Sequence, residues 1–443
     1  MDLPAHLTTV LRRLGLPPGR AVVAVSGGPD SLALLDLLVR THAEHRLALV
    51  VAHADHGIHP DSARVAGQVA RIAGAYGLPC VVGRLHLGAE HPYPTETVAR
   101  EARHAWLREV ATHEGAATIF LAHHADDQAE TVLLRVLKGS GIAGLRGMDR
   151  RRGMLVRPLL GVPRAALREY VVSQGLEVWD DPANLDRRHL RSWVRTDVLP
   201  ALRERVPAVD RHLRRTAREA ARDTEAWGAV LRHLSELELR AEPAGPSVNA
   251  APLARYDGVL AEAVIRALGR LAGGVVGPRA ARRALALARA GVSGKHAQLG
   301  AGWVAELSFG RLHVRPEAPA GTLSPLALAG DGGRATWGGW RVEWRREPAP
   351  AGQGRGGFTA WFLPDTLAVR PWRRGDRIAP LGGTGRRLAV RCFQDARVPA
   401  GRRARWPLLD AGGRLVWIPG VCRSNDLLPP EGAEALRVEF HAT

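Results

Sequence analysis

The first 140 residues alternate short, nearly continuous apolar runs with longer segments in which apolar residues recur at helical spacing. The apolar runs predict buried parallel strands, because a strand covered on both faces needs no polar alternation. These runs are Ala21–Val25, Leu47–His53, Cys80–Leu87 and Ala117–His123. The helical segments are Ser31–Thr41, Pro60–Tyr76, Thr95–Glu114 and Ala125–Leu137. This alternation predicts an α/β fold with a doubly wound parallel sheet, whose ligand crevice lies beyond the carboxyl ends of the strands.

The pattern changes twice further along the chain. From Val162 to about Gly291, Leu and Ala recur at helical spacing between Arg- and Glu-rich faces, which predicts a helical extension and a helical middle domain. From Gly302 onward the helical periodicity fades, and Pro348–Gly357 has the composition of a linker. We therefore expect an α/β domain over residues 1–210, a mainly helical domain over 211–345 and a small α+β domain over 358–443.

Composition narrows the class of protein. With 443 residues, 46% of them hydrophobic, the chain can bury two or three domain cores. No apolar run is long enough to cross a bilayer and the first residues lack the zones of a signal peptide, so we expect a cytoplasmic protein with no membrane partner. Cys80, Cys392 and Cys422 form no CxxC pair, which disfavours disulfide, zinc and sulfur-transfer chemistry.

The net charge points to a polyanionic partner. The chain has 62 Lys and Arg against 44 Asp and Glu, a formal charge of +18, and neutralising phosphates releases condensed counterions. Nucleic acid is the leading candidate. Only Lys138 and Lys295 are lysines, and a GC-rich genome would produce the same arginine bias, so the charge alone leaves both explanations open.

The sharpest motif is SGGPDS, Ser26–Ser31, between the first predicted strand and the first predicted helix. Its glycines let backbone amides approach an anion, the helix N-terminus adds partial positive charge, and the serines supply hydroxyl donors. The segment therefore predicts a phosphate cradle, although a Gly-Gly turn with Asp and Ser capping the helix is the structural alternative. Asp30 would repel phosphate unless Mg²⁺ lay between them, so we assign it a metal-bridging role.

Two further polar segments follow strands two and four, at His53–Ser62 and Ala122–Thr131. Both should reach the same crevice, because parallel strands end at one edge of the sheet. The second segment places Asp126, Asp127 and Glu130 at a helix start. Carboxylates there can hold Mg²⁺, bind an ammonium group or cap the helix, and capping alone would account for only one of them.

A metal-dependent hydrolase is an alternative interpretation of the same segments. Its candidate ligands are His53, Asp55, His56, His59, His123, His124 and Asp126. That interpretation leaves the phosphate cradle unexplained.

At this point the sequence resembles a known family. SGGxDS after the first strand resembles the pyrophosphate loop (PP-loop) of the ATP pyrophosphatases, which cleave ATP between the α and β phosphates and transfer AMP to a substrate oxygen. The DHG and HHxDDQxET elements after strands two and four resemble the tRNA(Ile)-lysidine synthase family. Over roughly residues 20 to 200 the same order of matches continues through Glu96, Ala99, Arg100, Arg103, Trp106, Gly139–Met148, Arg157–Leu160, Asp180–Asn184 and Arg191–Arg195.

The end of the chain is similar to the C-terminal module of that family. The matching segments are Val369–Gly382, Phe393–Pro399, Arg402–Leu409 and Gly413–Gly420. Arginines clustered around Trp372, Trp406 and Trp417 are suited to contact RNA phosphates and to stack on bases. Tryptophans buried in a core beneath solvated arginines are the alternative.

The resemblance implies a two-step ligation. The O2 of the wobble cytidine in an isoleucine tRNA with anticodon CAU attacks the α-phosphorus of ATP, and the ε-amine of free lysine then attacks C2 and expels AMP. The modified anticodon reads AUA in place of AUG. ATP and Mg²⁺ are the implied cofactors, and the partners are the tRNA and free lysine, with a homodimer left open.

Residue by residue, the resemblance implies four groups at the site. The catalytic residues are Asp30, Arg103, Asp126 and Asp127, with Asp30 and Asp126 as metal ligands. The ATP-binding residues are Ser26, Gly27, Gly28, Pro29, Asp30, Ser31, Asp55, His56 and His123. Lysine would contact Arg103 and Asp127. The tRNA-binding residues are Arg191, Arg195, Arg373, Arg374, Arg377, Arg402 and Arg403. Ser192 stands where the family usually has Asn, which puts any hydrogen bond of that amide in doubt.

Two other functions remain as alternatives. Another PP-loop enzyme, such as a tRNA thiolase or an amidotransferase-type synthetase, would need reactive cysteines or a glutaminase part, and neither signature is found. A noncatalytic RNA-binding protein with a residual nucleotide fold is disfavoured because Asp30, Asp126 and Asp127 are all intact.

Overall fold

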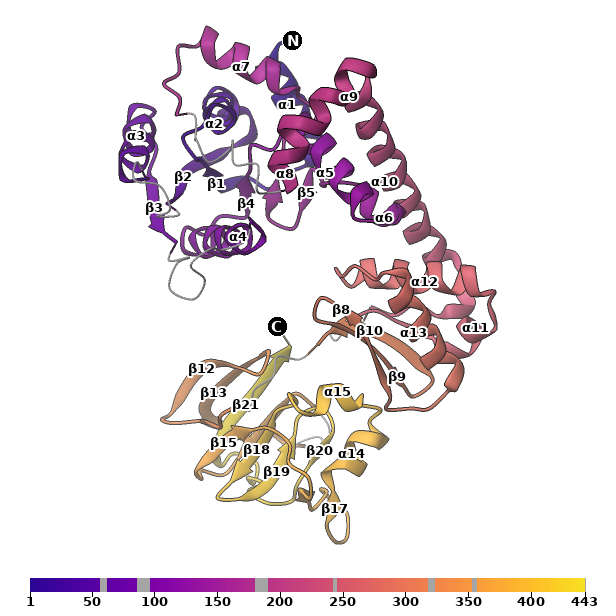
Figure 1. Ribbon diagram of the computed structural model, residues 1–443. Helices are drawn as coiled ribbons and strands as arrows, with labels where there is room; N and C mark the ends of the chain where they lie inside the picture. The colour runs from indigo at the N-terminus through magenta and orange to yellow at the C-terminus, as the bar shows by residue number, and fades with distance from the viewer. Residues whose placement is uncertain are drawn as a thin grey trace. The chain divides into compact units, whose positions relative to one another are not determined.

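The computed structural model describes residues 1–55, 62–85, 96–179, 190–241, 245–317, 323–352 and 357–442 of the chain. Two compact units make up the protein, Met1–Thr224 and Glu225–Thr443 (Figure 1). Among the described residues, no helix combines the length and the apolar character needed to cross a membrane.

The first unit is built on a six-stranded sheet with the order β3-β2-β1-β4-β6-β5. Five strands are parallel and β5 is an antiparallel edge strand. Their bounds are β1 Gly19–Ala24, β2 Leu47–Asp55, β3 Cys80–Arg84, β4 Thr118–Phe120, β5 Arg151–Arg152 and β6 Leu155–Val156. The expected doubly wound parallel sheet is confirmed, with β4 and β3 shorter than their apolar runs.

Helices cover both faces of this sheet, which explains why its strands are apolar on both sides. Alternate β1 residues divide between two hydrophobic clusters: Ala21 and Val23 pack with α1, α2, α3 and α7, whereas Val22 packs with α4. These helices are α1 Leu3–Leu14, α2 Pro29–Thr41, α3 Ser62–Ala75, α4 Glu96–His113 and α7 Arg164–Ser173. Figure 1 places α4 on the face opposite α2.

The strand order reverses at β1, which lies between β2 and β4. The loop after β1 and the loop after β4 therefore emerge side by side, at the kind of switch point where open α/β sheets bind ligands. The rest of the unit is helical. It comprises α5 Ala125–Leu137, α6 Ile142–Leu145, α8 Leu190–Trp193, a π-helical turn at Val194–Val198, α9 Leu199–Arg205 and most of α10, Val209–His233.

The second unit opens with helices around a small sheet. The predicted helices are α11 Ala250–Arg255, α12 Gly258–Leu271 and α13 Pro278–Ala290. They pack on a four-stranded sheet with the order β7-β10-β9-β8, which the sequence analysis did not predict. Its strands are β7 Ser247–Asn249, β8 His296–Gly300, β9 Trp303–Ser308 and β10 Arg311–Pro316.

The end of the chain forms two sheets around an aromatic core. One sheet has the order β11-β15-β18-β19-β20 and the other β12-β13-β21-β14, with a separate β16–β17 hairpin. The strands are β11 Leu326–Ala327, β12 Gly332–Trp337, β13 Trp340–Pro348, β14 Thr359–Phe362, β15 Leu367–Arg370, β16 Arg377–Ile378, β17 Arg387–Leu388, β18 Leu408–Ala411, β19 Arg414–Ile418, β20 Cys422–Arg423 and β21 Glu434–Ala442. Two short helices, α14 Ala389–Asp395 and α15 Ala400–Arg403, complete it.

This region begins earlier in the chain than the sequence suggested. Strand β13 pairs with β21 along its whole length, so residues 332–348 belong to the same sheet as the C-terminal strand. Trp406 and Trp417 are buried among the core residues, at 7% and 1% exposure, which leaves neither indole free to stack on a base. The start of α15 also contacts the preceding sheet, because Gly401 N donates to the buried Glu306 carboxylate at 3.1 Å.

Candidate active site

The loop between β1 and α2 is held in a fixed shape by its own polar groups. Ser31 Oγ donates to Gly28 O at 2.9 Å and accepts from Ser26 N at 3.1 Å. Gly27 has φ +87°, and a Cβ there would lie 2.8 Å from a methyl group of Val65, so only glycine fits. In the described structure α2 begins without a side-chain cap. Its partial positive charge therefore faces the loop, as an anion site requires.

Asp30 extends from this loop with one oxygen paired and one unpaired. Its Oδ2 lies 3.5 Å from His124 Nε2 and 3.9 Å from Arg164 Nε. Its Oδ1 is buried and has no hydrogen-bond partner among the described residues. A buried carboxylate oxygen without a donor is costly unless a cation occupies the position. Asp30 Oδ1 therefore lacks, within the described chain, the partner that its burial requires.

His124 links Asp30 to the start of α5. It is the N-cap of that helix: His124 N donates to Asp127 Oδ2 at 3.0 Å, and Asp127 N donates to His124 Nδ1 at 3.4 Å. With Nδ1 accepting, Nε2 carries the hydrogen toward Asp30. Burial opposes protonation of His124, but the hydrogen bond to Asp30 and the charges of Asp127 and Asp126 outweigh it and raise the pKa.

Two carboxylates and two arginines form a cluster beside this histidine, which we call the acid–arginine cluster: Asp127, Glu130, Arg191 and Arg195. Asp127 Oδ1 accepts from Nη2 of both arginines at 3.2 Å. Glu130 accepts from Nε of Arg191 at 3.1 Å and from Nε of Arg195 at 2.6 Å. The two acids are buried, at 8% and 3% exposure, so the pairs lie largely out of water.

The charges of the acid–arginine cluster and of its neighbours shift the pKa values of Asp127 and Arg195. Burial would raise the pKa of Asp127, but the charges of His124 and Arg191 and the hydrogen bond from the His124 backbone lower it below its ordinary range. Burial would lower the pKa of Arg195, and the hydrogen bond and charge of Glu130 raise it instead. Both groups are therefore ionised, and the cluster balances two negative charges with two positive ones.

Asp126 turns away from Asp127 to a different set of partners. Its Oδ2 accepts from the backbone N–H of Arg164 at 2.9 Å, and its Oδ1 lies 3.5 Å from Arg203 Nη2. Arg203 is itself fixed by Asp210 through two bonds of 2.7 and 2.8 Å. The neighbouring carboxylates thus have different arginine partners, although both lie near His124, whose Nδ1 is 3.8 Å from Asp126 Oδ2 and whose Nε2 is 3.4 Å from Asp127 Oδ2.

Burial and three arginines, Arg100, Arg103 and Arg157, which we call the arginine wall, keep two histidines neutral. Burial, followed by the charges of Arg103 and Arg100, lowers the pKa of His104 to about 4. Burial likewise lowers the pKa of His123, against the opposing charge of Asp127, and Arg157 and Arg100 lower it further. His123 Nδ1 is buried without a hydrogen-bond partner in the described part of the chain. The arginine wall is therefore positively charged, and the neutral His104 and His123 add no charge to it.

Two family models match the chain, the PP-loop domain over residues 5–202 and the TilS substrate C-terminal domain over residues 367–440. A tRNA(Ile)-lysidine synthase from Symbiobacterium thermophilum is 34% identical, and the match covers 97% of this chain and 95% of the relative. The same-named protein of Geobacter sulfurreducens is also 34% identical, over 95% of this chain and 93% of its own. The chain belongs to the tRNA(Ile)-lysidine synthase family. The corresponding protein of Thermus thermophilus is 34% identical over 99% of this chain and 75% of its own length.

This member of the tRNA(Ile)-lysidine synthase family brings many of the expected residues together. The PP-loop, His123, Asp126 and Asp127 lie at the ends of β1 and β4, and Asp55 ends β2. Arg191 and Arg195, expected to contact tRNA, form ion pairs with Asp127 and Glu130. His56 lies outside the described residues, as does His59 of the metal-hydrolase alternative. His53 donates from Nδ1 to Val25 O at 2.8 Å, and no metal-binding group of three His, Cys, Asp or Glu forms within the described residues.

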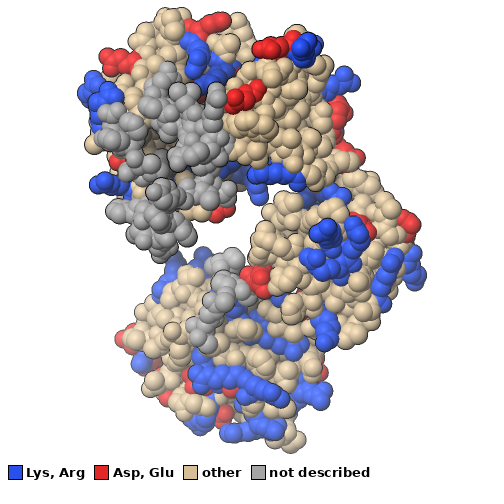
Figure 2. All heavy atoms as spheres, viewed as in Figure 1, with Lys and Arg blue, Asp and Glu red and all other residues tan. Residues whose placement is uncertain are grey.

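The expected tRNA contacts at the end of the chain lie in the second unit. Arg373, Arg374 and Arg377 are exposed around the start of β16. Arg402 lies over the ring of Trp406, 5.2 Å from its centroid, and Arg403 donates to Val398 O at 2.9 Å. Figure 2 shows Lys and Arg side chains recurring across the lobe that contains these residues.

Sequence reasoning missed two residues at the site of this lysidine synthase family member. Arg164 places its backbone N–H on Asp126 and its side chain near Asp30. Arg203 approaches Asp126 from α9. The signal for Arg164 was present, since it opens α7 shortly after the short apolar segment that forms β6, at the same edge of the sheet. Arg203 gave no local signal, because its contact depends on how a later helix packs.

Proposed function

We propose that the protein ligates free lysine onto C2 of the wobble cytidine in isoleucine tRNA with anticodon CAU, through an adenylated base. The observation that carries this proposal is the meeting of the PP-loop and the acid–arginine cluster at the ends of β1 and β4. The PP-loop is suited to bind a phosphate group, and the acid–arginine cluster is suited to bind an amino acid. Membership in a family whose relatives are named tRNA(Ile)-lysidine synthase supplies the substrates.

In the first step the PP-loop holds the phosphates of ATP while the cytidine O2 attacks the α-phosphorus. The fixed turn at Gly27 and the uncapped start of α2 present backbone donors to the pyrophosphate that leaves. Ser26 and Ser31 hold that turn through their hydroxyl contacts. The step forms an oxygen–phosphorus bond and makes the O2 of cytosine part of a good leaving group, AMP.

The residues around Asp30 fit a Mg²⁺ ion. The ion prefers carboxylate oxygens, and Asp30 Oδ1 is a buried oxygen without a donor among the described residues. Asp30 would hold the ion, with Asp126 as the second carboxylate at the same edge of the sheet. When bound, Mg²⁺ neutralises phosphate charge in the transition state.

In the second step the acid–arginine cluster holds lysine. Its carboxylates suit an ammonium group and its guanidinium groups suit the α-carboxylate, so the cluster offers both charges that the amino acid carries. The lowered pKa of Asp127 favours a binding role, because a weak base holds a cation without taking its proton. Asp126, whose own partners are Arg164 and Arg203, then accepts the proton that the attacking amine loses. Arg103, on the arginine wall, orients the lysine carboxylate or a phosphate.

The tRNA is held mainly by the second unit in this proposal. Residues 1–210 act as the ATP pyrophosphatase domain, 211–345 as a substrate-binding domain and 358–443 as a tRNA-binding domain, to which β12 and β13 contribute strands. The exposed arginines around β16 contact phosphates.

Incorporation of labelled lysine tests the proposal. The substrate is a transcript of the CAU-anticodon isoleucine tRNA with ATP and Mg²⁺, and the initiator methionine tRNA and an Asp127→Asn variant serve as controls. Incorporation into the isoleucine tRNA alone, strongly reduced in the variant at low lysine concentration, is the expected result. Release of pyrophosphate without attachment of lysine would keep the PP-loop chemistry and reject the substrate.

A further inference from the structure

Two of the three cysteines lie against each other in the second unit. Cys392 belongs to α14, and Cys422 opens β20. Their side chains are hydrogen-bonded to each other and pack in the same hydrophobic core. The two residues lie far apart in the chain, so the sequence gave no sign of this pair. The proposed ligation of lysine uses neither thiol.

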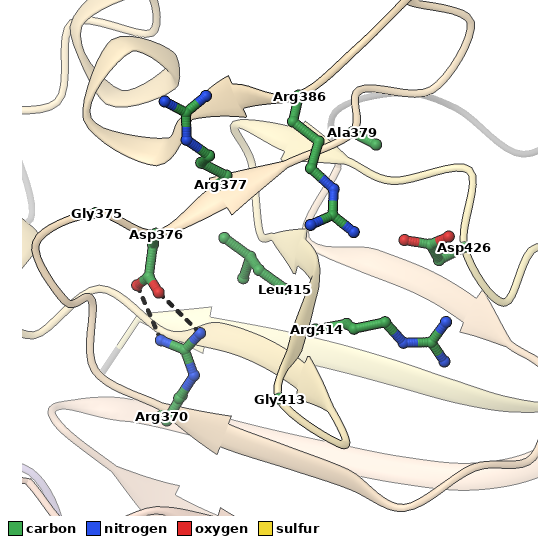
Figure 3. A pocket seen from close by; sticks show the side chains of 10 residues that line it. All are labelled: Arg370, Gly375, Asp376, Arg377, Ala379, Arg386, Gly413, Arg414, Leu415 and Asp426. Carbon is green, nitrogen blue, oxygen red and sulfur yellow. Dashed lines mark hydrogen bonds and ion pairs between the residues drawn. The ribbon is translucent and has the colours of Figure 1, made fainter.

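The segment around β16 binds both elements through its backbone. Before β16, Asp376 O accepts from Ala389 N, at the start of α14, at 2.8 Å. After β16, Leu381 N donates to Arg423 O of β20 at 2.7 Å. This segment lines the pocket drawn in Figure 3, where Asp376 and Ala379 mark two positions along it. The backbone of the fold therefore brings α14 and β20, and with them the two thiols, to the same place.

The two thiols differ in their access to solvent. Cys392 is 4% exposed, whereas Cys422 is partly exposed. The thiol of Cys422 also has a second acceptor, Arg423 O, at 3.8 Å from its Sγ. A reagent from solvent therefore meets the pair at Cys422, and only a small molecule such as hydrogen peroxide can pass on to Cys392.

The surroundings favour a thiolate at Cys392. The hydrogen bond from Cys422 lowers the pKa of Cys392 to about 7; burial opposes this shift, the charge of Arg387 adds to it and that of Asp395 partly offsets it. The same hydrogen bond raises the pKa of Cys422. An ion pair of 2.6 Å between Arg387 and Asp395 holds the guanidinium group in place. One thiolate beside one thiol is the arrangement from which a disulfide forms.

We propose that Cys392 and Cys422 form a redox-sensitive site, at which a peroxide oxidises the two thiols to one disulfide within the chain. The Cys392 thiolate attacks one peroxide oxygen and becomes a sulfenic acid, while the other oxygen leaves as hydroxide and takes a proton to become water. The Cys422 sulfur then attacks the sulfenic sulfur, loses its proton and expels the remaining oxygen as water. The two sulfurs lose two electrons, and the two peroxide oxygens gain them.

The disulfide would connect α14 to β20. The sulfurs need only move from hydrogen-bond contact to a bonding distance of about 2.05 Å. Cross-linking two positions that are distant in the chain restricts the unfolded state, so the oxidised protein should resist unfolding better than the reduced protein.

Peptide mapping of the oxidised full chain tests the proposal. The reduced protein is treated with hydrogen peroxide, its remaining thiols are blocked with N-ethylmaleimide, and trypsin then releases Cys392 within residues 392–397 and Cys422 within residues 415–423. We expect these two peptides to be joined by a disulfide that dithiothreitol cleaves. The urea midpoint of the oxidised chain should rise by about 1 M.

Cys80→Ser is the matched control. Cys80 lies on β3 in the first unit, and burial raises its pKa, so it is a poor thiolate. This variant should form the disulfide and gain stability as the wild type does. Cys392→Ser and Cys422→Ser should form no disulfide within the chain, and peroxide should not raise their urea midpoints.

Other outcomes would reject the site. Three free thiols after treatment, or oxidation of Cys422 to a sulfinic acid without a disulfide, would show that the pair does not close. A disulfide that includes Cys80 or joins two chains would place the reaction elsewhere. A disulfide that lowers the urea midpoint would show that it forms in the unfolded chain and not between α14 and β20 in the fold.

Discussion

At the scale of single residues, two adjacent carboxylates have different partners. Asp126 and Asp127 follow each other at the start of α5, and successive helical residues point about 100° apart. Asp127 therefore joins Glu130 and the two arginines, whereas Asp126 meets Arg164 and Arg203. Sequence alone gave no means of separating their roles. Their partners come from elements tens of residues away.

Substituting each carboxylate should produce different defects. We expect Asp127→Asn to raise KM for lysine more than about tenfold, because a charged contact is lost, while ATP binding is retained. Asp126→Asn should instead lower kcat with little change in KM for lysine. Steady-state lysine incorporation at varied lysine concentration measures both. Identical kinetic defects in the two variants would contradict the division of roles.

His124 predicts a pH dependence of stability. Its pKa is raised in the fold, so the folded protein binds this proton more tightly than the unfolded chain does. The resulting stabilisation is complete below the ordinary value of 6.5 and is lost as pH rises through the folded-state pKa. His124→Asn keeps an N-cap side chain and removes the titration. Urea midpoints measured across this range should fall with pH in the wild type, and the fall should be smaller in the variant.

At the scale of elements, a buried aspartate connects three helices behind the site. Asp36 of α2 accepts from Tyr76 at 2.7 Å, from Arg40 at 2.7 Å and from Tyr170 of α7. The first residue of α7 is Arg164, whose backbone N–H reaches Asp126. The network therefore holds α7 where it can complete the active site.

Removing this charge should weaken the fold. Asp36→Asn leaves buried donors poorly matched, and we expect it to cost about 3 kcal/mol of unfolding free energy, against about 1 kcal/mol for Tyr170→Phe. Burial opposes ionisation of Asp36, but the bonds from Arg40, Tyr170 and Tyr76 lower its pKa. Its stabilisation is thus present above 3.8 and lost as pH falls through the folded-state pKa. Urea denaturation tests the ranking, and equal losses in the two variants would refute it.

Some elements of the fold could be predicted from the sequence and others could not. The parallel strands were predictable because burial on both faces makes them continuous apolar runs, as in Val22 and Val23. The sheet of β7 to β10 was not, because buried polar residues such as Glu306 and His313 interrupt the apolar runs of its strands. The clustering of Arg191 and Arg195 on Asp127 was also beyond sequence, since it depends on packing across more than 60 residues.

At the scale of the whole molecule, the positions proposed for ATP chemistry and those proposed for RNA contact lie in different units. The PP-loop and the acid–arginine cluster belong to Met1–Thr224, whereas the exposed arginines around β16 belong to Glu225–Thr443. Removal of the second unit should therefore separate the two activities. A cut before Phe358 would be unsuitable, because it removes β21, the partner of β13.

A fragment of residues 1–233, which keeps α10 whole, should bind ATP about as well as the full chain. It should bind tRNA at least about tenfold more weakly and with a shallower salt slope, because phosphate contacts are lost. Fluorescence binding of labelled tRNA at several salt concentrations, beside ATP titration, measures both. Full tRNA affinity in the fragment would place the RNA contacts in the first unit.

The balanced charges around Asp127 and Glu130 would make the proposed binding of lysine an exchange of partners. In the free protein each carboxylate already pairs with a guanidinium group. The ammonium group of lysine would therefore compete with Arg191 and Arg195 for the same oxygens. Its affinity is then the difference between two similar pairings. A small inorganic cation would bind weakly, because it replaces a guanidinium group without forming a better pairing. A shorter amino acid would bind more weakly than lysine, because its amine cannot reach both acids while its carboxylate contacts an arginine. Selectivity for lysine can thus arise in a site whose carboxylates are always paired with a cationic group.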